Sequence, residues 1–266
     1  MRLVVLVVLG VLGACGGDRP RPAPPAKPAA GQLRVMSYNV NFGIAGDPPS
    51  IAAIAGAHPD IVVLQETNEV WEAALVETLG ARFPHRRFRS PPGWPASGFG
   101  ILSRFPIVAL DELPAIAGPF IAWRIVVDTP LGRIQILNLH LRPPMSDGGS
   151  WVVGYWSTRE VRREELQYHL ESLDHTLPTV IAGDFNEESS GLAMRHLTDR
   201  GYADAIATYR GDAPTWSWPV SSGITLRFQL DHLLHDPHFI AVAADIVDAG
   251  RSDHLPIWAD LERVAP

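Results

Sequence analysis

The sequence predicts an α+β fold in which strands outnumber helices. Seven short runs rich in Val, Ile and Leu, most of them bounded by turn residues, have the lengths of strands, whereas four stretches carry apolar residues at the three- and four-residue spacing of a helix. The strand-like runs mostly follow one another as neighbours without one helix after each, which argues against a doubly wound parallel sheet. We see no internal repeat and no second linker, so a single domain is expected.

Short apolar runs mark the expected strands, at residues 33–36, 61–64, 100–102, 121–127, 133–139, 179–182 and 230–234. The turn residues at 128–132 predict a hairpin between the fourth and the fifth of these strands. Helices are expected at 50–57, 68–79, 158–173 and 191–199. Several of these stretches begin with Ser, Thr or Asn, the residues that cap helix N-termini.

The N-terminus has the pattern of an export signal. Residues 3–12 form an apolar run that is too short for the ~20 residues needed to span a bilayer as a helix. Residues 12–15, Leu-Gly-Ala-Cys, resemble the lipobox of bacterial lipoproteins, which implies cleavage before Cys15 and lipidation of its thiol; a plain secretory signal is the alternative. We therefore expect a signal peptide at 1–14, a lipidated Cys15 with a Pro-rich tether at 15–31, and a folded domain at 32–266. Gly16, and not Asp, follows the Cys, so we expect an extracytoplasmic location at the outer membrane or cell surface.

Composition excludes several kinds of chemistry from the folded domain. Cys15 is the only Cys and Lys27 the only Lys, so residues 32–266 contain no thiol nucleophile, disulfide, Cys-bound zinc, Schiff base or P-loop lysine. Those residues hold 18 basic and 28 acidic side chains, a net charge of −10 with His neutral. A polyanionic substrate would be repelled by this average charge, so its binding would need divalent cations or a local Arg surface.

Polar residues follow several of the expected strands and could reach a common site. They are Asn39, Glu66, His140, Asp184, Asn186, Asp231, Asp253 and His254. Oxygen ligands from Asn39, Glu66 and Asp253 suit Mg²⁺ or Mn²⁺. Each also has a simpler interpretation, because Glu66 could cap the helix expected at 68–79, Asn39 could serve a turn, and Asp253 could cap the residues from 255 onward.

Six short motifs follow one another along the chain: Met36-Ser37-Tyr38-Asn39, Leu64-Gln65-Glu66, Asn138-Leu139-His140-Leu141, Gly183-Asp184-Phe185-Asn186, Leu230-Asp231-His232 and Ser252-Asp253-His254-Leu255-Pro256. In the same order they resemble the motifs of the endonuclease/exonuclease/phosphatase superfamily, which has the DNase I-like fold. The resemblance implies a four-layer α/β/β/α sandwich, with two mostly antiparallel sheets packed face to face and flanking helices. It also implies Mg²⁺-dependent cleavage of phosphoester bonds, with residues 32–266 as the catalytic domain.

The resemblance assigns expected metal ligands. Glu66 would be the principal ligand of Mg²⁺, with Mn²⁺ as a substitute. Asn39 and Asp253 would complete or extend the metal site, directly or through water.

The resemblance also implies a pairing of Asp231 with His254, in which the Asp fixes the imidazole tautomer. Either His254 or Asp184, the latter supported by Asn186, would activate the attacking water, and both alternatives stay open. His140 would bind a phosphate oxygen or assist the leaving group. An acid that pairs with this His in some members of the superfamily has no equivalent that we can find in this sequence.

The motifs do not choose the phosphoester. The residues after Asn186 match neither the inositol 5-phosphatases nor the abasic-site endonucleases of the superfamily. We expect a secreted, membrane-anchored, monomeric phosphodiesterase or nuclease. The alternatives are a sphingomyelinase-like phospholipid phosphodiesterase, suggested by Trp-rich loops and the tether, and a catalytically silent binding module. The segment 142–156 is expected to form a long loop that borders the site. Arg159, Arg162 and Arg163 are expected to pair with neighbouring Glu residues on a solvated helix face, with contact to a polyanionic substrate as the alternative.

Overall fold

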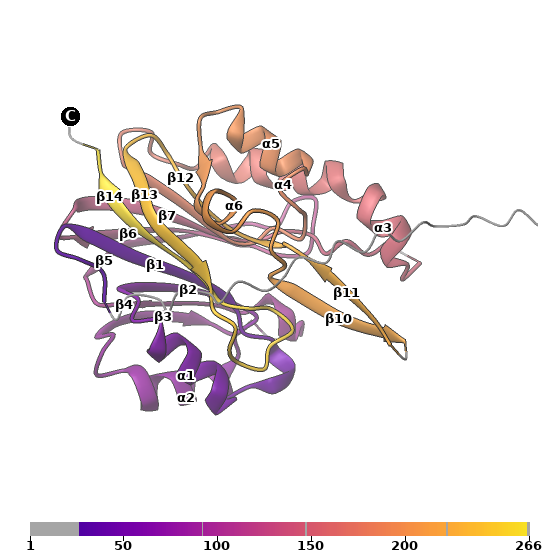
Figure 1. Ribbon diagram of the computed structural model, residues 1–266, viewed down its shortest axis with the longest axis horizontal. Helices are drawn as coiled ribbons and strands as arrows, with labels where there is room; N and C mark the ends of the chain where they lie inside the picture. The colour runs from indigo at the N-terminus through magenta and orange to yellow at the C-terminus, as the bar shows by residue number, and fades with distance from the viewer. Residues whose placement is uncertain (1–26, 92, 147, 222, 265–266) are drawn as a thin grey trace, which may run out of the picture.

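Two six-stranded sheets pack face to face, and helices cover their outer faces (Figure 1). The computed structural model describes residues 27–91, 93–146, 148–221 and 223–264. The predicted export signal and Cys15 lie outside these ranges. Within them, no helix has the length and apolar character that crossing a membrane requires.

The first sheet has the strand order β13-β14-β1-β2-β4-β3. Its strands are β1 (Gln32–Asn39), β2 (Ile61–Gln65), β3 (His85–Arg89), β4 (Phe99–Ser103), β13 (Phe239–Ile246) and β14 (Ile257–Arg263). Only β1 and β2 pair in parallel, and the other neighbours are antiparallel. Helices α1 (Pro48–Gly56) and α2 (Glu69–Leu79) lie against the outer face of this sheet.

The second sheet has the order β5-β6-β7-β8-β12-β9. Its strands are β5 (Ile107–Leu113), β6 (Ala122–Thr129), β7 (Gly132–His140), β8 (Thr179–Asp184), β9 (Ala203–Asp204) and β12 (Asp231–His235). Here β7 and β8 form the parallel pair. Helices α4 (Arg159–Leu170) and α5 (Leu192–Thr198) cover the outer face. Three further elements lie around the sheets: α3 (Trp151–Ser157), α6 (Ala205–Arg210) and the hairpin β10 (Trp216–Ser221) with β11 (Ile224–Phe228).

Alternation along the strands divides the apolar residues into three layers. In β1, Leu33 and Val35 face the core between the sheets, whereas Met36 and Tyr38 face α1 and α2. This is the two-residue period of a strand with both faces buried. The three cores that result, one between the sheets and one under each helical layer, confirm the four-layer sandwich.

The structure confirms all seven expected strands, all four expected helices and the hairpin, with ends shifted by a few residues. The missed strands include β3 and β5, whose side chains are mostly half-buried or exposed. In β3 the only apolar residue is Phe88, whereas β5 begins with an apolar run at 107–110 that was not selected as a strand. Residues 151–156, expected as part of a loop, belong to α3, which the Ser150 side chain caps by accepting from Val153 N.

Candidate active site

The candidate residues converge because four of them continue the inward-facing rows of their strands. Asn39, His140, Asp184 and Asp231 are each an even number of residues from an apolar residue of the core between the sheets. The register also places Asp184 opposite both His140 and Asp231. Alternation therefore directs all four side chains into the space between the sheets at the same end of the sandwich.

A buried polar layer separates this site from the apolar core. Gln65 Nε2 donates to Asn138 Oδ1 at 2.7 Å and to Ser37 Oγ at 3.2 Å, so side chains from both sheets are joined below the site. Asn138 in turn donates to the carbonyl of Leu64 at 3.2 Å. These bonds fix the relative position of the sheets where the catalytic candidates begin.

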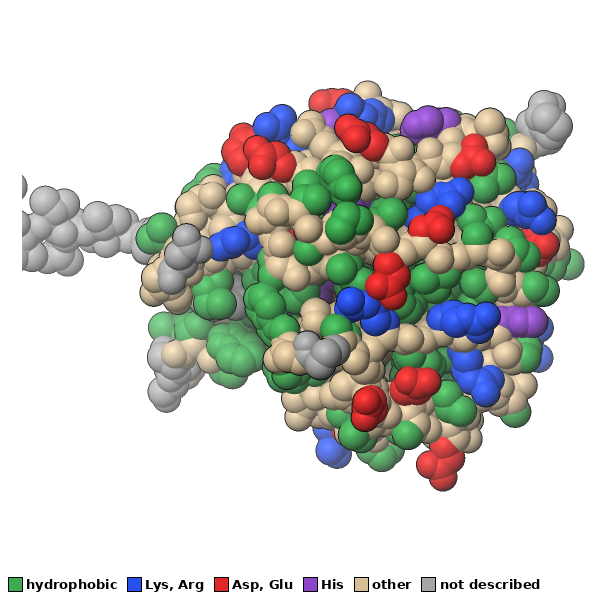
Figure 2. Space-filling model, turned by 180° about the vertical axis from the view of Figure 1, so that it is seen from behind, with side chains coloured by type: hydrophobic (Ala, Val, Ile, Leu, Met, Phe, Trp, Pro, Cys, Tyr) green, Lys and Arg blue, Asp and Glu red, His purple; other side chains and the backbone are tan. Residues whose placement is uncertain are grey.

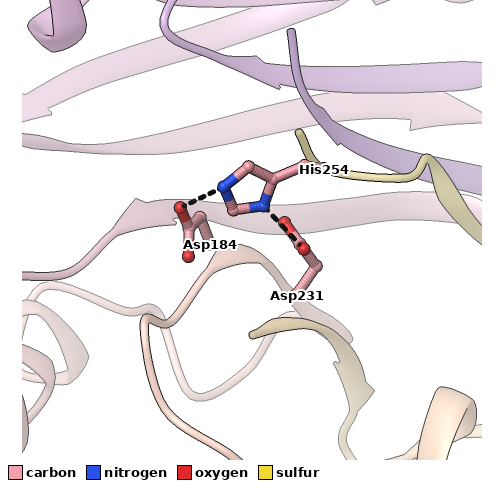
Figure 3. A group of neighbouring side chains, drawn as sticks. All are labelled: Asp184, Asp231 and His254. Carbon is pink, nitrogen blue, oxygen red and sulfur yellow. Dashed lines mark hydrogen bonds and ion pairs between the residues drawn. The ribbon is translucent and has the colours of Figure 1, made fainter. Parts of the chain in front are cut away.

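His254 lies between two carboxylates (Figure 3). Its Nδ1 is 2.9 Å from Asp231 Oδ2, and its Nε2 is 3.5 Å from Asp184 Oδ2. Burial alone would lower the pKa of His254, but Asp231 and Asp184 raise it to about 10. Burial raises the pKa of Asp184 to about 7, with Asp231 adding to the effect and His254 opposing it. The predicted Asp231–His254 pairing is therefore present, and Asp184 joins it.

Glu66 and Asn39 form the second part of the site. The Asn39 amide Nδ2 donates to Glu66 Oε1 and to Asp184 Oδ2, each at 3.1 Å. Burial raises the pKa of Glu66. Glu66 does not cap α2, because the Asn68 side chain does so by accepting from Trp71 N at 3.0 Å.

Backbone strain is concentrated at this site. Glu66, Asn41 and Asn186 have φ values of 60°, 59° and 52°. Asn tolerates this left-handed conformation, but for Glu it costs of the order of 1 kcal/mol. The strained backbone at Glu66 is compensated by the bonds that its carboxylate accepts from Asn39 and, at 3.4 Å, from Phe42 N.

Asp253 lines the pocket but is held by two donors. Its Oδ1 accepts from Asn41 Nδ2 at 2.7 Å and its Oδ2 from Trp216 Nε1 at 3.0 Å. Sequence reasoning did not select either Asn41 or Trp216. The two-residue spacing of Asn39 and Asn41 was a signal for the first, and no local pattern marked the second. The arrangement favours a contact between Asp253 and a metal through water over a direct one.

His140 and Asn186 complete the set. His140 Nε2 is 3.5 Å from Asp184 Oδ2 and 4.0 Å from Glu66 Oε1, and Phe120 stacks on the ring at 3.8 Å between centroids. Burial lowers the pKa of His140 to about 3, so this imidazole is neutral. Asn186 N donates to Asp184 Oδ1 at 2.9 Å, and its side chain donates to the carbonyl of Leu141 at the same distance, so Asn186 supports Asp184.

All eight candidates lie in one cluster: six of them line a pocket of about 380 Å³, and the other two, Asn39 and Asp231, are hydrogen-bonded to residues that line it. The half-buried carboxylate of Glu66 and the buried carboxylate of Asp184, both with raised pKa, offer the oxygen ligands that a divalent cation prefers. Ligand atoms of Asp184, Asp231 and His254 also lie within 4.8 Å of one another. The close Asp231–His254 bond occupies two of those three groups, so the Glu66 side of the pocket fits a cation better.

Two expectations about the surroundings had different outcomes. The segment 142–156 does border the pocket, through Pro143 and Met145. Arg163 pairs with Glu160 on the exposed face of α4, as expected. Arg162 instead is fully buried and pairs with Glu187 at 3.2 Å, so it is neither a surface residue nor a contact for substrate.

Several solved structures have a fold similar to that of this chain. An endonuclease/exonuclease/phosphatase from Beutenbergia cavernae DSM 12333 is 25% identical, with a TM-score of 0.70 over 87% of this chain and 72% of its own. D. rerio TDP2 complexed with a single-strand DNA product is 17% identical, with a TM-score of 0.64 over 87% of this chain and 99% of its own. The human Nocturnin catalytic domain with a bound sulfate anion is 17% identical, with a TM-score of 0.62 over 89% and 96%.

A search of curated proteins found no significant match. A family model described as "Endonuclease/Exonuclease/phosphatase family" matches residues 36–254, most of the domain. This span contains all six motifs except the last two residues of the closing one. The chain therefore belongs to the endonuclease/exonuclease/phosphatase family.

Proposed function

We propose that this protein is a divalent-metal-dependent phosphodiesterase that hydrolyses its substrate by in-line attack of water on phosphorus. Members of its family generally hydrolyse phosphoester bonds. The observation that carries the proposal is the row of contacts Asp231–His254–Asp184–Asn39–Glu66. Each neighbouring pair in this row is 2.9–3.5 Å apart, so groups that can transfer a proton lie directly beside groups that can bind a cation.

Glu66 and Asn39 would hold the cation, Mg²⁺ or Mn²⁺, with Asp253 acting through water. When bound, the cation would polarise a phosphoryl oxygen and offset the charge that develops on the phosphoryl group. The hydrogen bonds from Asn41 and Trp216 would keep the Asp253 carboxylate oriented toward that water.

Two residues are placed to take the proton of the attacking water. His254 is oriented by Asp231, which fixes the ring so that Nε2 faces the pocket; it would act from its neutral form, which a nearby cation would favour by opposing the two carboxylates that raise its pKa. Asp184 is the other candidate, since it is buried beside Nε2 and supported by Asn186. His140, neutral and aimed at the same carboxylates, would donate to a phosphate oxygen or to the leaving group.

We further propose that the protein is exported and anchored in the outer membrane through lipid on Cys15, as a monomer. The support is the lipobox-like sequence at 12–15 and the Pro-rich residues that follow it. Labelled fatty acid incorporated by wild type but not by Cys15→Ser would test this, and equal absence of label from both would contradict it.

The activity is tested with the full chain and Mg²⁺, Mn²⁺ or EDTA, using bis-p-nitrophenyl phosphate, supercoiled plasmid and RNA in parallel. We expect metal-dependent hydrolysis of at least the small diester, lost with His254→Ala. Metal binding is measured separately by thermal unfolding, in which Mg²⁺ stabilises wild type but not Glu66→Gln. Turnover that is unaffected by EDTA, or by both substitutions, would overturn the proposal.

A further inference from the structure

Four segments around the mouth of the site carry almost no charge. We call them the rim: residues 90–98, 114–121, 142–158 and 214–228. Of their 49 residues only Arg142, Asp147 and Arg227 are charged. Because 19% of the whole chain is charged, a stretch of this length would ordinarily hold about nine such residues.

Described residues from all four rim segments line two adjoining pockets. The site pocket is walled by Pro143, Met145, Trp216 and Trp218. A second pocket of about 490 Å³, lined by Trp94 and residues 117–119, shares Pro143 and Met145 with it. The site thus opens into an apolar groove rather than directly into a charged surface.

An aromatic row connects the β10–β11 hairpin to α3. Trp216 stacks on Trp218 and on Phe228, with ring centroids 6.4 and 6.0 Å apart. Phe228 stacks on Tyr155 at 5.9 Å, and Tyr155 meets Trp156 edge-on at 5.4 Å. The hairpin and α3 lie at the same end of the molecule (Figure 1), so the row forms one side of the rim.

Exposed apolar side chains are concentrated on the rim. Among the described residues fifteen large apolar side chains are exposed, and the rim holds eight of them although it is less than a fifth of the chain. The eight are Trp94, Ile116, Met145, Val153, Trp156, Trp218, Val220 and Ile224. They include every described Trp that is exposed, and Figure 2 shows hydrophobic side chains gathered at this end, on the left of the view.

We propose that the rim docks the protein on a lipid surface, so that the site acts on an amphiphilic phosphodiester whose apolar part stays in the lipid. The choice of substrate rests on the proposed phosphodiesterase function; the docking does not. Binding of an apolar surface with Trp at its edge to a lipid–water boundary is favourable, and the binding strength rises with the apolar area that is buried there. The single phosphate of such a substrate needs no row of cations.

Nucleic acid fits the rim less well. A polyanion is held by several Lys or Arg contacts to its phosphates, and the rim offers two Arg on a domain with a net charge of −10. Two of the Arg residues outside the rim are engaged within the domain: Arg82 donates to the carbonyls of Ala55 and Pro59, and Arg162 is buried against Glu187. Stacking of bases on the aromatic row is then the competing outcome of the test.

The experiment uses residues 16–266, which lack both the apolar run at 3–12 and the predicted acylated Cys15 but keep every described residue of the fold, so that any vesicle binding comes from the folded domain. Co-sedimentation with vesicles of phosphatidylcholine and sphingomyelin is compared with hydrolysis of those lipids, of bis-p-nitrophenyl phosphate and of plasmid. The rim variant is Trp156→Ser with Ile224→Ser, since these side chains are 66% and 57% exposed and do not line the site pocket. The matched control is Val108→Ser with Ile240→Ser, exposed on β5 and β13.

We expect the rim variant to bind vesicles, and to hydrolyse their lipid, at least tenfold less well, while turnover of the small diester stays within twofold. The control should match wild type in every assay, and binding should change little between roughly 50 and 500 mM NaCl because few charges take part. Equal vesicle binding by wild type and rim variant would overturn the docking even if the small diester is hydrolysed. Salt-sensitive plasmid cleavage without vesicle binding would assign the groove to nucleic acid. Vesicle binding without hydrolysis of any diester would contradict the proposed function alone.

Discussion

The eight candidate residues form the floor of the site, and this floor and the rim are built from opposite kinds of residue. On the floor, charged side chains are buried and bonded on several sides, as with Asp184, which meets Asn39, His140 and His254. On the rim, apolar side chains are exposed and contact one another mainly through rings. The difference indicates that the residues of the floor specify the catalytic chemistry, whereas the residues of the rim specify the surface on which the protein acts.

A second buried network fixes the floor from behind. Glu187 follows Asn186, and its carboxylate accepts from Arg162 Nε at 3.2 Å and, on the other oxygen, from Met194 N at 3.1 Å at the start of α5. The carbonyl of Glu187 lies 2.9 Å from Nε2 of His232, whose Nδ1 is 2.7 Å from a carboxylate oxygen of Asp204. His232 therefore faces away from the site, as its position next to Asp231 in a strand predicts. The loop that carries Asp184 and Asn186 is held on both sides.

The largest effect is expected from removing a catalytic group of the floor. His254→Ala should lower kcat by about 10²–10⁴, the range typical of a lost acid or base. The variant also leaves the buried carboxylates of Asp231 and Asp184 without the cation between them, so its unfolding is measured beside its kinetics. His175→Ala, an exposed His at a distant loop, is the control and should keep full activity. A fall of less than tenfold in His254→Ala, measured by steady-state kinetics with saturating Mg²⁺, would show that the site is misassigned.

Breaking the network behind the floor should affect stability next most strongly. Arg162→Met leaves the buried Glu187 carboxylate without its cation, which ordinarily costs about 3–5 kcal/mol of unfolding free energy. Arg163→Met is the matched control on the same helix, because its pair with Glu160 is exposed and is worth well under about 1 kcal/mol. Urea unfolding of both variants measures the difference, and equal midpoints would mean that Arg162 does not support the floor.

Glu165 lies where floor and rim meet, and it should make stability depend on pH. Its Oε2 accepts from Arg142 N at 2.9 Å, and a Cβ on Gly118 would lie 1.8 Å from its Oε1. Burial raises the pKa of Glu165 to about 7 from an ordinary value of 4.5. The folded state therefore binds the extra proton between these values, and stability falls as pH rises through them, by about 3 kcal/mol at most.

Glu165→Gln removes that titration while keeping the shape of the side chain. Unfolding free energy measured from pH 4.5 to 8 should fall less steeply in the variant than in wild type. Parallel curves for the two proteins would assign the pH dependence to other groups.

Much of the sandwich could be predicted because its central strands are buried on both faces and so appear as continuous apolar runs, as in β2. An edge strand such as β3 lacks that signal, because its side chains are mostly His and Arg and none of them is fully buried. In the site, local motifs sufficed for residues such as Glu66 and Asp184. Asn41 was missed because its partner, Asp253, is 212 residues away in sequence, and only the fold brings the two together. The rim was foreseen only as a Trp-rich loop, because exposure is a property of the whole surface.

Trp216 belongs to both regions, and replacing it should separate their contributions with the smallest effect of the series. Its Nε1 donates to Asp253 on the floor, while its ring stacks on Trp218 and Phe228 in the rim. Trp216→Phe removes the donor and keeps an aromatic ring, so Asp253 loses one hydrogen bond of about 1–1.5 kcal/mol. We expect kcat on a small soluble diester to fall about five- to tenfold while vesicle binding is unchanged. If vesicle binding falls and kcat does not, then Trp216 serves the rim alone, and Asp253 is oriented by Asn41 without it.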